Sequence, residues 1–357
     1  MRAYIFLKLN ILIILFLFPF IQISGDTSII VSTSKLDWSQ NVLQKITNNV
    51  LVSELNILNA GNKFGNRDVI LYCVNLSTIS IQTNSISIKQ QENKWEYNYF
   101  VKQGSTTQNI PIQTYGNLTY QNNPALDIQF TTLDQDHAVA RFFTPKFNAI
   151  YHTNSGFFGG AQLFASDYYV SGVHISTGIS NITALTANSL TQSNGLIGRD
   201  AIEYRNTALG PGLGLGYQRN ITANLFIRSA IWQDYMVGQL SFKNLSSGLT
   251  SYSQKQFFYY YTYQQNSMLT SFNTTFEIGF GYNITEKISL FLNYSKMERH
   301  IHTHLNRLSR SGYQLYGNEF YSDSVGQVLA SLNMLRKNLN GTNEQLQEIT
   351  FSFIYKF

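Results

Sequence analysis

The last nine residues of the chain, 349–357, have two chemically different faces. Every second residue is apolar and mostly aromatic: Ile349, Phe351, Phe353, Tyr355 and Phe357. Side chains of a strand alternate with a period of two, so these five share one face, while the other face is polar except for Ile354. Such a strand fits a barrel wall between lipid and a polar interior. The edge strand of a soluble sandwich is the alternative.

The first 25 residues are organised like a secretory signal peptide. Arg2 and Lys8 precede an unbroken apolar run at 11–21, and the small residues Ser24 and Gly25 follow. The run has 11 residues, whereas a membrane-spanning helix needs about 20, although an uncleaved anchor remains the alternative. No later apolar stretch approaches spanning length. If the exported chain enters a membrane, it must therefore do so as a closed barrel.

The composition agrees with a wall that contacts lipid. Charged residues make up 13% of the chain and aromatic residues 14%, against about 25% charged residues in a typical soluble domain. Tyrosine and phenylalanine suit the girdles where a barrel meets the lipid headgroups. The net charge of +5 is small and no basic helix accompanies it, which excludes nucleic acid as a partner. The single Cys73 excludes an internal disulfide and a cysteine-based zinc site.

Two segments predict hairpins of membrane-spanning length. Apolar and polar residues alternate over 272–282 and again over 288–294, around a tight Asn-Ile-Thr turn, and residues 214–225 repeat this unit. Each strand has about ten residues, which a tilted strand needs to cross the hydrocarbon. This alternation predicts polar residues that line the interior of the barrel. The candidate pore-lining residues are Asn224, Arg228, Glu277, Lys287, Asn293 and Lys356.

Connections of unequal length predict the orientation. The turns near 220 and 284 are short and are expected in the periplasm, whereas the polar stretches 180–209, 243–255 and 297–327 are expected as external loops. A further hairpin is predicted between strands 157–165 and 168–178, and the sequence leaves its side open.

Residues 37–58 break the strand pattern. Trp38, Val42, Ile46 and Val50 recur every four residues behind the N-cap candidate Asp37, which predicts an amphipathic helix. This short N-terminal helix would belong to a segment 26–66, packed on the barrel rim or placed as a periplasmic or lumenal plug. The transmembrane antiparallel β-barrel would occupy 67–357. At about 28 residues per strand with its loops, an all-β barrel of about 12 strands is expected, with 8 to 14 acceptable.

The C-terminal pattern resembles the closing strand of bacterial outer-membrane barrels. That resemblance implies that the barrel assembly machinery reads Phe351, Phe353, Tyr355 and Phe357 as a C-terminal signal. From about residue 138 the chain also resembles the Legionella-type major outer membrane protein family, in its segments 156–163, 208–215 and 235–241. The family's additional cysteines and aromatic-rich opening strand are missing here. Membership implies a Gram-negative outer-membrane porin and surface antigen that contacts lipid, lipopolysaccharide and a host surface ligand.

Three groups of residues could carry catalytic or metal chemistry. Residues 134–137 hold an Asp-x-Asp pair without a matching Asp-His pair, and His152 with Ser155 lacks a third member. The imidazoles of His300, His302 and His304 share one side of an extended segment, which suits a metal, a wet basic loop or the phosphates of lipopolysaccharide. Since no carboxylate or cysteine accompanies them, no metal site and no cofactor are predicted.

The sequence therefore predicts an outer-membrane porin for passive diffusion of small hydrophilic solutes, and not an enzyme. A closed surface barrel that acts as an adhesin or structural protein is the alternative, followed by an outer-membrane hydrolase. The oligomeric state, including a homo-oligomer, stays open.

Overall fold

The computed structural model describes residues 26–39, 41–42, 45–46, 67–72, 78–120, 126–184, 190–252, 255–316, 319–322, 329 and 341–357. Within these ranges, the side chains of 67–72, 108–120, 126–138, 173–184, 190–200, 250–252, 255–257, 259, 314, 316 and 319–322 are not described. The predicted signal peptide, 1–25, lies outside the described residues and stays a prediction.

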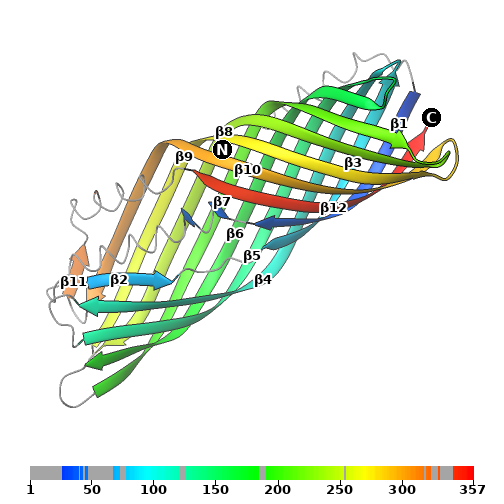
Figure 1. The fold of residues 1–357 in the computed structure, drawn as a ribbon. Helices are drawn as coiled ribbons and strands as arrows, with labels where there is room; N and C mark the ends of the chain where they lie inside the picture. Colours follow the sequence, from blue (N-terminus) through cyan, green and yellow to red (C-terminus); the bar gives the residue numbers. More distant parts are fainter. Residues whose placement is uncertain are drawn as a thin grey trace.

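Antiparallel strands make up nearly all of the described chain (Figure 1). The long strands are β1 (Asp26–Ser39), β3 (Ile79–Glu92), β4 (Trp95–Tyr120), β5 (Leu126–His152), β6 (Phe157–Ala184), β7 (Leu190–Asn220), β8 (Leu225–Tyr252), β9 (Lys255–Asn283), β10 (Ile288–Tyr316) and β12 (Thr342–Lys356). Two short strands, β2 (Arg67–Tyr72) and β11 (Glu319–Ser322), pair with β4 and β10.

The described strands close into a barrel of ten. Strand β12 pairs with β10 on one side and with β1 on the other, where the register runs from Ser28↔Lys356 to Ser39↔Gln345. The remaining long strands pair in sequence order from β1 to β10, so each has two neighbours and no long edge is left open. The expectation of about 12 strands was too high because the strands are longer than assumed. Strands β4 to β10 each have 26 to 31 residues.

Large apolar side chains form an exposed band on the outer wall, next to the short turns. We call this band the apolar belt; it comprises Val31, Ile86, Trp95, Val101, Tyr151, Phe157, Leu163, Leu209, Leu213, Leu215, Ile231, Tyr235, Val237, Phe272, Phe276, Phe280, Tyr282, Leu292, Tyr294, Ile349, Phe351, Phe353 and Tyr355. The predicted orientation of the C-terminal strand is confirmed: Phe351 is 49% exposed, whereas Ser352 faces inward and is buried. An outward apolar band around a closed barrel is the surface that lipid requires.

Beyond the belt, the same strands continue with a polar outer face, which we call the extension. Its outward side chains include Lys35, Asp37, Arg141, Asp167, Glu203, Arg205, Lys243, Lys296, Glu298, His300, His302 and His304. The expected external loops at 180–209, 243–255 and 297–327 are wrong, because β6 to β10 run through most of these residues. A strand that leaves the membrane no longer needs an apolar outer face, so its sequence looks like that of a loop.

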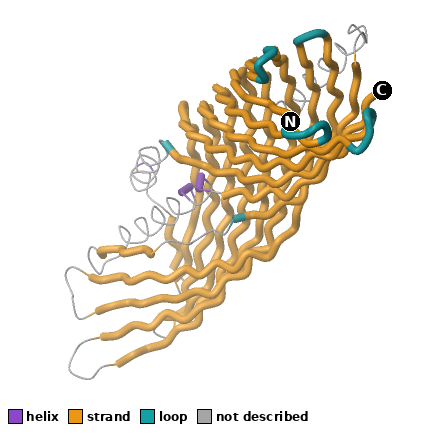
Figure 2. Tube along the Cα trace, turned by 45° about the vertical axis from the view of Figure 1, so that its right-hand side comes forward, coloured by secondary structure: helices purple, strands orange, loops and turns teal. Residues whose placement is uncertain are grey.

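The short turns gather at one end of the barrel, as predicted for the turns near 220 and 284 (Figure 2). The repeated Asn-Ile-Thr segments form equivalent turns. Thr222 Oγ1 accepts hydrogen bonds from the backbone N–H groups of Asn224 and Leu225, at 3.3 and 3.0 Å. Thr285 Oγ1 accepts the same pair from Lys287 and Ile288 at the same two distances. The sequence repeat therefore reflects a repeated turn structure.

Two local expectations are wrong. Residues 166–167 are not a turn, because β6 continues from Phe157 to Ala184. The helix predicted at 37–58 cannot begin at Asp37, since residues 26–39 form β1 inside the barrel wall, so the barrel does not begin at residue 67. The structure describes no helix there beyond helical backbone at residues 41–42 and 45–46, and most of 37–58 lies outside the described residues. The position of Trp38 fits the apolar spacing of a helix and also that of a strand. Its pairing with Ile79 and Leu346 shows that it belongs to a strand.

Glycines permit close approach where β7 and β8 pair, and this contact is testable. A Cβ placed on Gly210 would meet the backbone of Tyr235 and Met236, which is less able to move aside than a flexible side chain. At Gly159 the nearest atom to such a Cβ is the flexible Leu215 side chain, at 3.2 Å. We expect Gly210→Ala to lower the free energy of unfolding by about 2 kcal/mol and Gly159→Ala by less than about 1 kcal/mol. Urea unfolding of the barrel in lipid vesicles measures both; equal effects would contradict the packing described.

Candidate functional site

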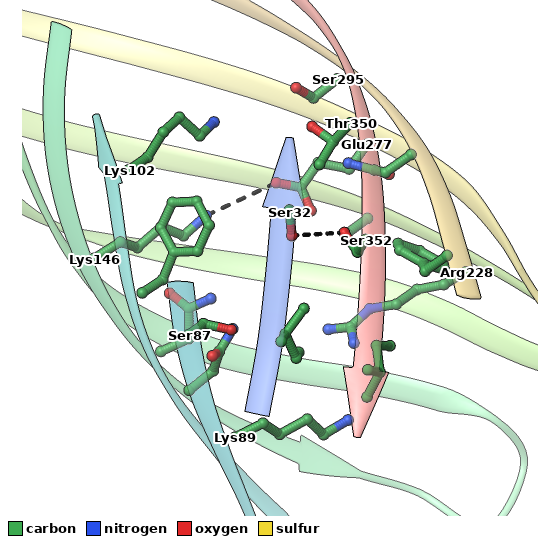
Figure 3. Close-up of a pocket in the computed structure, with 18 of the residues that line it drawn as sticks. Ser32, Ser87, Lys89, Lys102, Lys146, Arg228, Glu277, Ser295, Thr350 and Ser352 are labelled. Carbon is green, nitrogen blue, oxygen red and sulfur yellow. Dashed lines mark hydrogen bonds and ion pairs between the residues drawn. The ribbon is translucent and has the colours of Figure 1, made fainter. Parts of the chain in front are cut away.

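A polar cavity occupies the interior of the barrel at the level of the apolar belt. Its volume is about 550 Å³ and side chains from all ten barrel strands line it. Figure 3 shows Lys89, Lys102, Lys146, Arg228 and Glu277 around this space, together with the hydrogen bond between Ser32 and Ser352, of 2.8 Å. The interior is therefore hydrophilic where the exterior is apolar, as expected for a barrel that spans a membrane.

The structure brings four of the six predicted pore-lining residues to this cavity. Arg228, Glu277, Asn293 and Lys356 line it, Lys356 from the end of the last strand. Asn224 and Lys287 do not, because they lie in the two Asn-Ile-Thr turns and are exposed. Alternation placed the strand residues correctly but could not show where each strand ends.

Ion pairs cross the cavity between strands that are not neighbours. Lys102 on β4 meets Glu348 on β12 at 2.5 Å, and Lys146 on β5 meets Glu277 on β9 at 3.8 Å. Each pair joins walls at least three strands apart in the barrel order. Such links restrict the free passage through the cavity, since both side chains reach into it.

Glu96 is the centre of the largest charge cluster. Its carboxylate lies 2.8 Å from Lys89 Nζ, 2.9 Å from His152 Nε2 and 3.4 Å from Arg228. Its side chain is only 3% exposed. Arg228 comes from β8, on the far wall, so Glu96 also links opposite sides of the barrel.

Sequence reasoning missed Glu96, Lys102, Lys146 and Glu348. Polar residues are numerous on both faces of β4 and β5, so alternation did not show that Glu96, Lys102 and Lys146 face inward. Glu348, on β12, continues the inward face of the C-terminal strand and could have been found from its alternation. Fixing the register of β4 against β5, where Lys102 pairs with Thr144, is what assigns the faces. That register is a property of the folded barrel.

A packed layer closes the interior above the cavity. This closing layer consists of Trp38, Phe142, Tyr168, Tyr204, Arg299 and Glu344. The ring centroids of Trp38 and Tyr168 lie 5.6 Å apart, and those of Phe142 and Tyr168 lie 4.8 Å apart. The Arg299 guanidinium lies 4.7 Å from the Tyr168 ring and 3.3 Å from the Glu344 carboxylate.

The closing layer leaves little space for water. Trp38, Tyr168, Tyr204 and Arg299 are each 0% exposed, and Ile81, Met236 and Leu269 from other strands belong to the same buried cluster. Side chains buried to this degree resemble a protein interior, where few voids are larger than a water molecule.

The closing layer lies above the apolar belt, in the extension. Residues adjacent in sequence to its members face outward and are polar: Asp37 beside Trp38, Asp167 beside Tyr168, and Glu298 beside Arg299. Lipid would not accommodate such an outer face, so in a membrane this part of the barrel would lie outside the hydrocarbon. Burial raises the pKa of Glu344 to about 7, against the opposing charge of Arg299.

The three histidines lie on one face, as the sequence indicated. His300, His302 and His304 are all exposed on the outer side of β10. Two of them contact neutral groups: His300 Nδ1 lies 2.7 Å from Asn343 Oδ1, and His304 Nε2 lies 3.0 Å from Thr270 Oγ1. Among the residues that the structure describes, no group of three or more His, Cys, Asp or Glu could hold a metal ion.

The residues considered for catalysis are dispersed. His152 contacts Glu96, whereas the Ser155 hydroxyl lies 2.9 Å from that of Thr153. The side chains of Asp134 and Asp136 lie outside the described part, but the register of the backbone is informative. Position 136 on β5 lies opposite His174 on β6, and His174 lies opposite Asp200 on β7. No pattern in the sequence indicated this row of three positions. The expectation that the chain is not an enzyme stays a prediction.

Comparison with known families and curated proteins gives no match, so the Legionella-type resemblance stays a prediction. No helix in the described part of the chain is long and apolar enough to cross a membrane.

Solved structures similar to this chain include the outer membrane protease OmpT from Escherichia coli, at 10% identity, 93% coverage of this chain, 95% of that chain and a TM-score of 0.39. OprG from Pseudomonas aeruginosa follows at 10% identity, 94% and 96% coverage and a TM-score of 0.23. The toluene transporter TbuX from Ralstonia pickettii has 9% identity, 94% and 90% coverage and a TM-score of 0.28. These likenesses concern the barrel fold only.

The charge cluster around Glu96 makes a measurable contribution to stability. Replacing Glu96 by Gln leaves Lys89 and Arg228 in the interior without their shared counter-charge, so we expect a loss of about 2 kcal/mol in the free energy of unfolding. Glu203→Gln is the matched control, because Glu203 pairs with Lys243 on the exposed outer face and should change stability by less than about 1 kcal/mol. Urea unfolding measures both variants, and equal losses in the free energy of unfolding would contradict the larger contribution expected of the buried Glu96.

The raised pKa of the buried Glu344 carboxyl should make the stability of the barrel depend on pH. The pKa of this carboxyl is near 4.5 in the unfolded chain, whereas the folded chain retains the proton until about pH 7. The folded state therefore binds more protons in that window, and the carboxyl lowers stability as pH rises from about 5 to 7. Stability of Glu344→Gln relative to wild type should increase between pH 5 and pH 8, by up to about 3 kcal/mol. A constant difference across that range would contradict the assignment.

Proposed function

We propose that this chain is a bacterial outer-membrane barrel that is closed at rest and serves as a surface scaffold, either structural or adhesive. The observation that carries the proposal is the closing layer, in which Trp38, Tyr168 and Arg299 are fully buried across the interior. A general diffusion porin needs a continuous polar path, and a packed layer removes it.

The dimensions of the strands support a role at the cell surface. At about 3.3 Å per residue the 31-residue β7 is about 100 Å long, whereas about ten residues are enough to cross the hydrocarbon. Much of each long strand therefore forms the extension, beyond the apolar belt. A pore needs only loops outside the membrane, whereas strands that continue beyond the belt present a rigid surface away from the membrane.

The porin predicted from the sequence is the second candidate, and the polar cavity favours it. Arg228, Glu277, Asn293 and Lys356 line a space through which small hydrophilic solutes could pass, provided that the closing layer moved. A hydrophobic constriction that opens and closes is a known way to gate a channel. The two candidates differ in whether the wild-type barrel conducts.

Conductance in planar lipid bilayers tests the proposal. We expect folded wild-type protein to give no sustained channels, whereas Trp38→Ala combined with Tyr168→Ala should give discrete openings, because both rings leave the closing layer. The matched control is Trp95→Ala combined with Tyr151→Ala, which removes two contacting aromatic residues from the outer wall and should stay closed. Heat-modifiable mobility on gels verifies folding of each variant. Sustained conductance of the wild type would refute the closed barrel and favour the porin.

A further inference from the structure

A groove crosses the outer wall of the extension directly above the apolar belt. It has a volume of about 770 Å³ and is formed by strands β3 to β7. Its outward lining is polar and aromatic: Gln82, Asn84, Gln103, Ser105, Arg141, Phe143, Asp167, Tyr169 and Arg205. The groove opens on the outer wall and shares only Phe142 with the lining of the interior cavity, so its role does not depend on whether the barrel conducts.

The strand register builds the groove as two adjacent rows. In the upper row Ser105 pairs with Arg141, Arg141 with Tyr169, and Tyr169 with Arg205. In the lower row Asn84 pairs with Gln103, Gln103 with Phe143, and Phe143 with Asp167. Directly opposed residues on neighbouring strands lie within about 5.5 Å at Cβ, so each row is a continuous surface.

The charges in the groove leave one arginine without a carboxylate. Arg205 makes a bidentate pair with Asp167, at 2.9 and 2.7 Å. Arg141 is exposed and its guanidinium lies 5.8 Å from the Tyr169 ring, with no acidic side chain at ion-pair distance among the described residues. An arginine placed on an aromatic ring beside a second arginine suits a phosphate, which guanidinium groups bind through paired hydrogen bonds.

The rest of the lining suits a sugar. Gln82, Asn84 and Gln103 are exposed and offer both donors and acceptors of hydrogen bonds to hydroxyl groups. The Phe143 and Tyr169 rings lie among them and provide flat apolar faces. Phosphate and sugar recognition therefore meet in one groove.

The position of the groove indicates an amphiphile. The belt residues Ile86, Val101 and Leu209 lie on the same strands, within a few residues of the groove on the side of the membrane. A lipid with its acyl chains along these residues would bring its headgroup to the groove. A free sugar phosphate has no acyl chains, so the neighbouring apolar residues would not strengthen its binding.

We propose that the groove binds the phosphorylated sugar headgroup of an outer-leaflet glycolipid, the chemistry of lipid A in lipopolysaccharide, with Arg141 as the principal phosphate ligand and Arg205 as its neighbour. The site lies on β3 to β7, on the opposite side of the barrel from the histidine-rich strand β10, where the sequence suggested contact with lipopolysaccharide.

Native mass spectrometry of the folded full chain in detergent micelles, titrated with bisphosphorylated lipid A, tests the site. We expect Arg141→Gln to weaken binding about tenfold, the effect of losing one charge-assisted contact, and to leave binding of phosphate-free lipid A unchanged. Gln103→Ala should weaken binding of both lipids, because it removes a sugar contact and no charge.

Lys296→Gln is the matched control, since Lys296 also faces outward in the extension but lies on β10, beside Glu298. It should bind lipid A like the wild type. Equal weakening by Arg141→Gln and Lys296→Gln would overturn the proposal in favour of a general charge effect. Displacement of lipid A by glucosamine 1-phosphate at comparable concentration would also overturn it, because the headgroup alone would then be sufficient.

Discussion

The hydrogen-bonded pairing of β12 with β1 is the constraint on which the remaining structure depends. A strand in lipid has no water for its backbone groups, so each barrel strand must find two neighbours. The last strand supplies the missing neighbour for the first, from Ser28↔Lys356 to Ser39↔Gln345. Closure gives every strand an inside and an outside, and the alternation of side chains then separates the polar interior from the apolar belt. The fixed inward positions of Glu96, Arg228 and Trp38 follow from that geometry.

The interior has two parts that differ in chemistry. At the level of the belt, ion pairs such as Lys102–Glu348 and Glu96–Arg228 join strands that are not neighbours. Above the belt, rings and one buried pair, Arg299–Glu344, form the closing layer. At the belt, each of these charged side chains has an oppositely charged partner. In the closing layer, packed side chains fill the interior. Together they support a barrel whose surface, rather than its interior, meets its partners.

The sequence allowed the membrane-facing part of the barrel to be predicted well and the extension poorly. Phe351, Phe353 and Tyr355 reach lipid-facing positions as their alternation indicated, and the repeated turns at 222 and 285 match in their hydrogen bonds. Outside the membrane both faces of a strand can be polar, so the strands at 180–209 and 297–316 looked like loops. The segment beginning at Trp38 suggested a helix because its apolar residues fit two periodicities.

Alternation along the chain is enough to predict the class of fold and the apolar face of the wall strands, because alternation is a local property and lipid tolerates only one kind of residue on that face. The strand number, the partners of Glu96 and the closing layer that joins Trp38, Tyr168 and Arg299 become known only from the folded barrel. Trp38, Tyr168 and Arg299 each lie more than 100 positions from the other two, and the register of ten strands brings them together. No local pattern encodes that register, since it depends on every pairing around the closed barrel.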